Sequence, residues 1–467
     1  MESSRFSKLV FTCILLVGLT VRLLVAPFSS GSDIVQFAGF ARTIQRHGLC
    51  FYNYAAKFYT EKWPYNWPYV YGPVLAYILG LLSQFVSPDY TIYPARYPYV
   101  CVSTNWVFAV KLVYIMFDTV VAVLIYTITR KPLLVALYYL NPAVIYTSSI
   151  YGMFDQIPLA LLLLGLVSLR RKPLLAGSLL AVSLLTKQTI LFPVLGVLLT
   201  LLVHYRELFS RVLLGFLVGV LVIFSPIIVG CPSSILRLRE TVEETSYMWR
   251  PSYVSPFMYS LNGLTSILTL VHRKLSIETL WFIQHWYIYT LVLTPLLVLY
   301  TLRERDLYLN AALYYLLFTV TYWGINYQYL TPLIGLLAVS LARESRDRVR
   351  VLYTMIILYT AVWCFIFPMR WWFYAHIEHP NMTLVELVSL LSLNIHVDEY
   401  YVYYSLALTT LEYTTLLVVT LTPLGEVKVQ VERAVRVVNY TVYTVKRAVS
   451  VVLKFSKLFI HSLLELL

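Results

Sequence analysis

Long apolar runs dominate this chain, and short polar or basic segments separate them. A helix that crosses a bilayer needs roughly 20 apolar residues, with about 17 as the lower limit. The first run of that length covers about residues 9–26, and Arg5 and Lys8 precede it. Because basic residues concentrate in cytoplasmic loops, we expect the N-terminus in the cytoplasm and the following loop outside.

The next apolar run, residues 71–86, is short and begins after Tyr71 with Gly72-Pro73. If it crossed the membrane, every later basic cluster would lie outside. If it is a juxtamembrane or re-entrant helix, all of those clusters lie inside, as the positive-inside rule requires. We prefer the second interpretation, which extends the first outer loop over about residues 28–105. The clusters are Arg130-Lys131, Arg170 to Lys172, Arg206 with Arg211, Arg303 with Arg305, and Arg343 to Arg350.

The remaining periodicity predicts an all-α polytopic membrane protein with about twelve transmembrane helices. Both termini are expected in the cytoplasm. We also expect a long outer region over about 230–279 with a partial helix near 257–271, and a third outer loop over about 369–400. The expected spans are about 9–26, 107–128, 133–150, 156–169, two short helices between 172 and 204, 211–229, 280–301, 307–322, 329–341, 350–368 and 401–421.

The last 45 residues differ from the rest of the chain. Residues 423–467 mix valine with lysine and arginine, and the valines fall roughly along one stripe at helical pitch. This pattern is typical of a basic amphipathic helix on the inner leaflet, although a partner-binding helix has the same pattern. We therefore expect a membrane domain over residues 1–422 and a cytoplasmic tail helix after it.

Composition supports a protein embedded in a membrane. The chain is 59% hydrophobic, only 13% charged, and has a mean hydropathy of +0.72. The net charge of +13 would suggest a nucleic-acid partner on a soluble protein. Here the basic residues lie in short loops between apolar runs, so we exclude nucleic acid and expect membrane lipids as the surroundings. The five cysteines show no metal-ligand spacing, but Cys50, Cys101 and Cys231 fall on the expected outer side, where a disulfide is permitted.

Polar side chains that are costly near a bilayer gather on that same outer side. The topology was derived from basic loops alone, yet it places several ionisable groups and amides together, and such groups are functional candidates by default. They are Asp33 after the first span, Asp155 and Gln156 at the next outer turn, Lys187 at the turn after it, Arg250 in the long outer region, and Asn326 with Gln328 at a fourth turn.

Each candidate also has a purely structural interpretation. Asp33 and Asp155 are suited to capping the helices that follow them. Lys187 can extend its ammonium to the headgroups with no ligand, and the 326–328 segment can simply close a turn. Arg22, one to two turns below Asp33, can pair with a lipid phosphate. The mid-span Asp118 is interpreted as structural, paired with Lys111 or with another helix. These alternatives stay open at this stage.

The chemistry that suits the outer group is transfer from a lipid-phosphate donor. A donor phosphate at headgroup level would bind Lys187, Arg250 and Arg22. The acceptor hydroxyl needs a general base, and Asp33 is the natural candidate. Asp155 would hold the acceptor or, together with Asp33, a divalent cation such as Mg²⁺ or Mn²⁺; whether a metal is required is open. The substrate-binding candidates are Gln156, Asn326, Gln328, Tyr71 and Trp67, the last two in an aromatic loop able to stack on sugar rings.

The same segments resemble the GT-C superfamily of polytopic glycosyltransferases. The resemblance covers roughly residues 10–200. Its motifs are Arg22 with Ser32-Asp33, Phe51-Tyr52-Asn53, Tyr69 to Pro73, Asn141-Pro142 with Gly152, Asp155 and Gln156, and Gly177 to Lys187 with Phe192-Pro193. The stretch Phe108 to Asp118 is similar to the GPI mannosyltransferase catalytic subunit and its archaeal and bacterial relatives.

The resemblance implies an inverting transferase that uses a polyprenyl- or dolichyl-phosphate sugar, with Asp33 as the catalytic carboxylate. Many relatives carry Asp-x-Asp in this loop, whereas here Gly31-Ser32-Asp33 has one acid, which puts metal binding in doubt. Trp371-Trp372 is followed by Phe373 rather than by Asp, unlike the oligosaccharyltransferase subunit. Protein N-glycosylation is therefore disfavoured.

Two functional hypotheses follow. The first is a cell-membrane glycosyltransferase that moves a hexose, with mannose expected, to a lipid-linked or protein acceptor on the outer face. The second is a transporter or flippase for a lipid-linked sugar. A transporter would have ionisable groups along a path through the bilayer and inverted repeats. The one-sided cluster and the lack of a detectable repeat favour the transferase.

Overall fold

The computed structural model describes residues 2–55, 63–65, 67–93, 99–248, 260–367, 369–391 and 398–421. Arg250 and the expected tail helix over 423–467 lie outside the described residues. The expected boundary between a membrane domain and a tail therefore stays a prediction.

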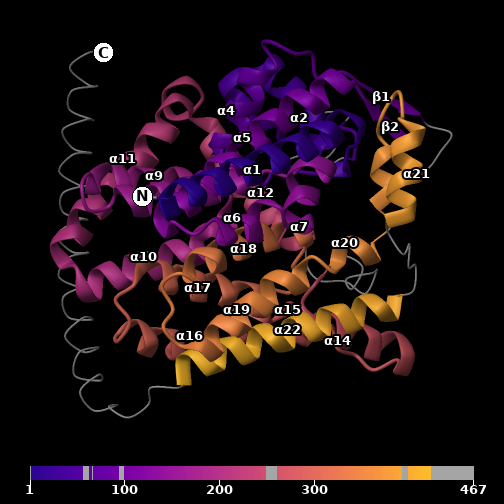
Figure 1. Cartoon of the computed structure of the whole chain (residues 1–467). Helices are drawn as coiled ribbons and strands as arrows, with labels where there is room; N and C mark the ends of the chain where they lie inside the picture. The colour runs from indigo at the N-terminus through magenta and orange to yellow at the C-terminus, as the bar shows by residue number, and fades with distance from the viewer. Residues whose placement is uncertain are drawn as a thin grey trace, which may run out of the picture.

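The described chain is almost entirely helical, as expected for an all-α membrane protein (Figure 1). The first half contains α1 Glu2–Val25, η1 Ala26–Phe28, α2 Ser32–His47, η2 Gly48–Cys50, α3 Tyr52–Ala55, α4 Pro73–Leu82, α5 Thr104–Thr129, α6 Pro132–Tyr139, α7 Pro142–Ile145, η3 Tyr146–Tyr151, α8 Gln156–Ser168, α9 Pro173–Thr186, η4 Gln188–Ile190, α10 Leu191–His204 and α11 Arg206–Gly230. The second half contains α12 Ser233–Met248, α14 Gly263–Leu275, α15 Leu280–Gln284, α16 Trp286–Thr301, α17 Leu307–Thr321, η5 Tyr327–Tyr329, α18 Leu330–Ser340, α19 Asp347–Thr360, α20 Trp363–Ile366, η6 Met369–Phe373, α21 Met382–Leu391 and α22 Asp398–Leu421.

The expectation of about twelve spans is not supported. Five described helical segments are long and apolar enough to cross a membrane, or six if the bent pair over 132–151 counts as one span. Other expected spans correspond to shorter helices, such as α8 with 13 residues and α9 with 14. At 1.5 Å per residue these helices reach only about 20 Å, less than the roughly 30 Å hydrocarbon core. Hydropathy overcounts here because short helices buried against other helices are as apolar as spans.

Two smaller expectations are confirmed. Helix α4 has only ten residues and is too short to cross a membrane alone; whether it is re-entrant stays a prediction. The partial helix expected near 257–271 appears as α14, which begins after Asn262, whose side chain accepts a hydrogen bond from the Thr265 N–H.

A β-hairpin corrects the purely helical expectation. Strands β1 Tyr90–Tyr93 and β2 Tyr99–Val102 pair antiparallel, with Tyr90 opposite Val102. Val102 also forms a parallel bridge with Ile377, in the segment after η6. The hairpin thus ties the first loop to a segment about 280 residues later, and α21 lies beside it (Figure 1).

One of the possible cysteine pairs is formed. Cys50 in η2 is bonded to Cys231, directly after α11, across a sequence separation of 181 residues. Cys101, the third expected outer cysteine, is free. The disulfide fastens the end of α2 to the end of α11.

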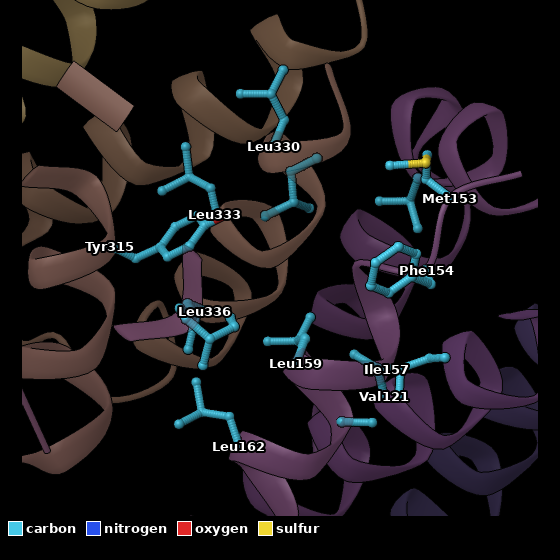
Figure 2. Packing of buried hydrophobic residues seen from close by; sticks show 14 of the residues in the cluster. Val121, Met153, Phe154, Ile157, Leu159, Leu162, Tyr315, Leu330, Leu333 and Leu336 are labelled. Carbon is cyan, nitrogen blue, oxygen red and sulfur yellow. The ribbon is translucent and has the colours of Figure 1, made fainter. Parts of the chain in front are cut away.

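The core joins the two halves of the chain along α8 and α18. Leu159 and Leu162 of α8 lie opposite Leu333 and Leu336 of α18, with Tyr315 of α17 beside them (Figure 2). Gly335 permits this approach, because a Cβ at that position would lie 2.6 Å from Leu159 Cδ2. Phe154 and Met153 extend the same packing toward the turn that carries Asp155 (Figure 2).

Candidate active site

Asp33 lies in the first turn of α2, where its charge complements the positive end of the helix dipole. Gly31, not Asp33, is the N-cap residue of α2. The capping interpretation of Asp33 is therefore not supported. The carboxylate is half-buried. Burial raises the pKa of Asp33 above its ordinary value, while the hydrogen bond from Tyr151 and the charge of Lys187 oppose the rise.

Tyr151, the last residue of η3, holds Asp33 in place. Its hydroxyl donates to Asp33 Oδ2 and lies 2.8 Å from Ser32 Oγ. The ring packs edge-on against Tyr327 and Trp372, each with centroids 4.9 Å away. Neighbours from three distant parts of the chain thus fix the position of this tyrosine. Tyr151 is not among the site residues that the sequence predicts.

The loop before Asp33 is anchored on two sides. The Ser30 N–H donates to Trp372 O at 2.7 Å, and the Gly31 N–H donates to Tyr151 O at 2.8 Å. Gly31 is required here because a Cβ would lie 2.3 Å from the Tyr151 ring. The backbone just before Asp33 is therefore fixed by hydrogen bonds to η3 and η6.

Lys111 of α5 completes this anchoring from beneath. Its side chain is fully buried, and its three N–H donors share four oxygens within hydrogen-bond distance: Ala26 O at 3.2 Å, Ser29 O at 2.6 Å, Ser29 Oγ at 3.0 Å and Ile150 O at 2.8 Å. The prediction that Lys111 pairs with Asp118 is wrong. The lysine instead binds together the end of η1, the Asp33 loop and η3.

Asp155 and Lys187 form a buried ion pair. Lys187 Nζ donates to Asp155 Oδ1 at 2.8 Å and to Oδ2 at 2.7 Å. Asp155 precedes α8 but makes no side-chain cap, so the capping interpretation fails here too. Lys187 is 2% exposed, so it does not extend to the headgroups. Burial raises the pKa of the Asp155 carboxyl, and the Lys187 ammonium opposes part of that rise.

Aromatic rings surround this ion pair. Lys187 Nζ lies 5.0 Å from the Phe154 ring centroid and 4.9 Å from that of Tyr329, within the range of cation–π attraction. Tyr71 meets Phe154 edge-on at 4.9 Å. Burial raises the pKa of Tyr71 well above its ordinary value, and the nearby charges of Asp33 and Asp155 raise it further. Tyr71 therefore lies near both carboxylates; its contact with a substrate stays a prediction.

Trp67, in the same loop as Tyr71, contacts Tyr65 and Gln36. Its ring stacks on Tyr65 at 5.2 Å, and its carbonyl accepts a hydrogen bond from Gln36. Tyr65 in turn contacts His376 of the segment after η6. Burial lowers the pKa of His376 to about 4, so this imidazole is neutral at pH 7.

The three candidate amides differ from one another. The Asn326 side chain accepts from the Tyr327 N–H and begins η5, so its turn-closing interpretation is confirmed. Gln156 donates to Met153 O at 2.9 Å, whereas its Oε1 has no partner among the described residues. Gln328 is 7% exposed, and its Oε1 is likewise without a partner in the described part of the chain. Gln156 and Gln328 thus each keep a side-chain acceptor that no described residue binds.

Arg22 does not join the site. It is fully buried, and its Nε donates to Asp118 Oδ2 at 3.0 Å. Its Nη1 donates to Gly18 O and Tyr139 O, and the guanidinium lies 4.0 Å from the Tyr139 ring centroid. Asp118 thus pairs with a residue of another helix, α1, which was one of the two predicted alternatives. The expected roles of Arg22 at a donor phosphate or a lipid phosphate do not fit this arrangement.

The carboxylates do not fit a metal site. Both oxygens of Asp155 accept from Lys187, and Oδ2 of Asp33 accepts from Tyr151. Among the residues that the structure describes, no three His, Cys, Asp or Glu side chains are grouped to hold an ion. A divalent cation would have to displace an ammonium that already neutralises Asp155.

The structure thus brings Asp33, Asp155, Lys187 and Tyr71 together, with the η5 segment alongside. Arg22 lies apart from them, and Arg250 falls outside the described residues. Tyr151 and Lys111 were not foreseen as parts of the site. For Tyr151 a signal existed, because it opens the polar turn at 151–156, between two apolar runs.

No protein-family model matches this chain. No curated protein matches it either. Among solved structures, it is similar to the crystal structure of ArnT from Cupriavidus metallidurans bound to undecaprenyl phosphate. The two share 13% sequence identity and a TM-score of 0.42, over 88% of this chain and 76% of that chain.

Proposed function

We propose that this protein is a membrane glycosyltransferase that moves a hexose from a polyprenyl- or dolichyl-phosphate donor to a lipid-linked or protein acceptor. The observation that carries the proposal is that half-buried Asp33 lies near enough to the buried Asp155–Lys187 pair for their charges to act on one another, with aromatic rings around the pair. Active sites arrange burial and charge in this way to shift the pKa of a base toward its working pH.

Asp33 is proposed as the catalytic carboxylate. It would accept the proton of the acceptor hydroxyl while that oxygen bonds to the anomeric carbon. The bond from that carbon to the phosphate oxygen breaks, and the lipid phosphate leaves with the electron pair. One displacement of this kind inverts the anomeric centre. Burial helps because a raised pKa strengthens Asp33 as a base while Tyr151 keeps it oriented.

Lys187 is the described cation best placed to act on the departing phosphate. Its ammonium has three N–H donors, of which two are directed at Asp155. The third remains for a phosphate oxygen, where positive charge stabilises the transition state. Arg250 is proposed as a second phosphate ligand on sequence grounds alone. Gln156, Gln328, Tyr71 and Trp67 are proposed to contact substrate, and mannose is the proposed sugar.

The orientation in the membrane is proposed from the sequence. The basic residues before α1 favour a cytoplasmic N-terminus, and Asp33 would then face the outer side of the cell membrane. The Cys50–Cys231 disulfide supports this orientation, because disulfides persist in oxidising compartments.

The test is a transfer assay with the full-length protein in liposomes. Polyprenyl-phosphate mannose and glucose, each radiolabelled in the sugar, are supplied on one face with a membrane lipid extract as acceptor. We expect label in a new product with one donor. Label that crosses the bilayer unchanged, with no product from any donor, would contradict the proposal and favour a flippase.

A further inference from the structure

Tyr114 of α5 is an anomaly next to the candidate site. The side chain is fully buried. Among the residues that the structure describes, no group forms a hydrogen bond with its hydroxyl. Buried hydroxyls are nearly always paired, because leaving one unpaired costs free energy, so an exception calls for a water or a ligand.

The position of Tyr114 ties this hydroxyl to the two carboxylates. The charges of Asp33 and Asp155 both act on it. Its ring lies 6.3 Å from the Phe154 ring, which also lies under Lys187. Tyr114, in the middle of the long helix α5, therefore lies near the same two carboxylates, which turns and loops position.

Two further tyrosines share this relation to the carboxylates. The charges of Asp33 and Asp155 also act on Tyr71, in the segment before α4, and on Tyr329, in η5. Three phenols from three separate elements thus surround one pair of carboxylates. The carboxylates can accept hydrogen bonds and the phenols can donate them. Of the three tyrosines, Tyr114 is the one that is fully buried.

The chemistry of this cluster selects the ligand group. A phosphate oxygen is negatively charged and can only accept hydrogen bonds, so the Lys187 ammonium suits it better than a phenol on which two carboxylate charges act. A sugar hydroxyl can accept from a phenol and donate to a carboxylate at once. Building on the function proposed above, we propose that Tyr114 is a substrate-contacting residue whose hydroxyl binds a ring hydroxyl of the donor sugar.

The chain offers a matched control in Tyr353 of α19. It too is fully buried, with a hydroxyl that has no partner among the described residues. The charges that act on it are those of Glu344, Arg346 and Glu304, not those of the candidate site. Replacing either tyrosine by phenylalanine removes one unpaired buried hydroxyl, so differences in folding cancel.

The experiment measures kcat/KM of the full-length protein with polyprenyl-phosphate mannose and its four monodeoxy analogues. We expect Tyr114→Phe to lose about fivefold to tenfold with the parent donor, as one neutral hydrogen bond predicts. With one deoxy analogue, the wild type and Tyr114→Phe should become equal, because the contact is then missing in both. Tyr353→Phe should follow the wild type with every donor.

Two results would overturn the role of Tyr114. One is full activity of Tyr114→Phe with the parent donor, which would leave a water as the only partner of the hydroxyl. The other is an equal loss with all five donors, which would indicate a structural role.

Donor binding, followed as the shift in thermal unfolding midpoint, separates this inference from the proposed function. Binding of the parent donor without any transfer would contradict the transferase alone. Equal affinity of the wild type and Tyr114→Phe for the parent donor would contradict the Tyr114 contact, whatever the protein does with that donor.

Discussion

The two buried ion pairs of this protein have similar chemistry but different surroundings. Arg22–Asp118 joins α1 to α5, and backbone carbonyls and Tyr138 bind most of its other polar atoms, although Arg22 Nη2 has no hydrogen-bond partner among the described residues. Asp155–Lys187 lies in turns between short helices, beside half-buried Asp33 and under aromatic rings. We call the first pair closed, because it lies between two long helices and most of its polar atoms bond to protein groups. We call the second pair open, because it lies beside the half-buried Asp33. Burial and opposite charge alone therefore do not distinguish a structural pair from a functional one.

The closed pair should show its largest effect in stability. Arg22→Met leaves Asp118 as an uncompensated buried charge, which costs about 3–5 kcal/mol of unfolding free energy. The double variant Arg22→Met/Asp118→Leu should recover most of that loss, since no charge is then left unpaired. Chemical denaturation in detergent micelles measures both. A double variant no more stable than the single one would mean that the pair does not interact as described.

The open pair should show its effect in turnover. Lys187→Met removes the cation proposed to act on the leaving phosphate, so kcat should fall roughly 10²- to 10³-fold, as for loss of one preorganised donor. The Lys187→Met/Asp155→Leu variant controls for the unpaired carboxylate and should remain equally inactive. Recovery of turnover in that double variant would show that Lys187 serves only to neutralise Asp155.

Acid pH should distinguish Asp33 from an ordinary surface aspartate. Because burial raises its pKa above the usual 3.8, the base becomes protonated at a higher pH than an exposed aspartate would. Transfer should then decline about tenfold per pH unit below that raised pKa. Tyr151→Phe removes a hydrogen bond that lowers the pKa, so its decline should begin at still higher pH. A profile of kcat/KM against pH, with the same acid limb in both proteins, would contradict this assignment.

Chelation should have the smallest effect. Lys187 occupies both oxygens of Asp155, so the cluster as built has no need of a divalent cation. We expect less than about a twofold change in transfer after EDTA treatment, because Lys187 is proposed to supply the positive charge that a metal would otherwise supply to the leaving phosphate. Activity that is lost with EDTA and restored by Mg²⁺ or Mn²⁺ would show that a metal displaces Lys187.

The sequence was sufficient to find the polar turns, because each interrupts an apolar run. Asp33, Asp155 and Lys187 were identified in this way, and the structure places them together. The sequence did not show which buried charges have all or most of their partners within the protein. The partner of Arg22 is 96 residues away and that of Asp33 is 118 residues away. Local patterns carry no information about such distant contacts.

The span count failed for a related physical reason. Hydropathy reports burial of any kind, so α8 and α18, which pack against each other in the core, look like spans although they are short (Figure 2). The hairpin was missed because its two strands have only four residues each. Its pairing with the Ile377 segment is again a long-range contact.

The most direct test compares the same substitution at two buried or half-buried aspartates, Asp33 and Asp118. Asp33→Asn and Asp118→Asn are purified with the wild type, and transfer of labelled sugar is measured in a single turnover on equal amounts of folded protein. The account predicts that Asp33→Asn binds donor but transfers at least about 10³-fold more slowly, because the catalytic carboxylate is gone. It also predicts that folded Asp118→Asn transfers within a few-fold of wild type. Transfer by Asp33→Asn at the wild-type rate would contradict the central claim.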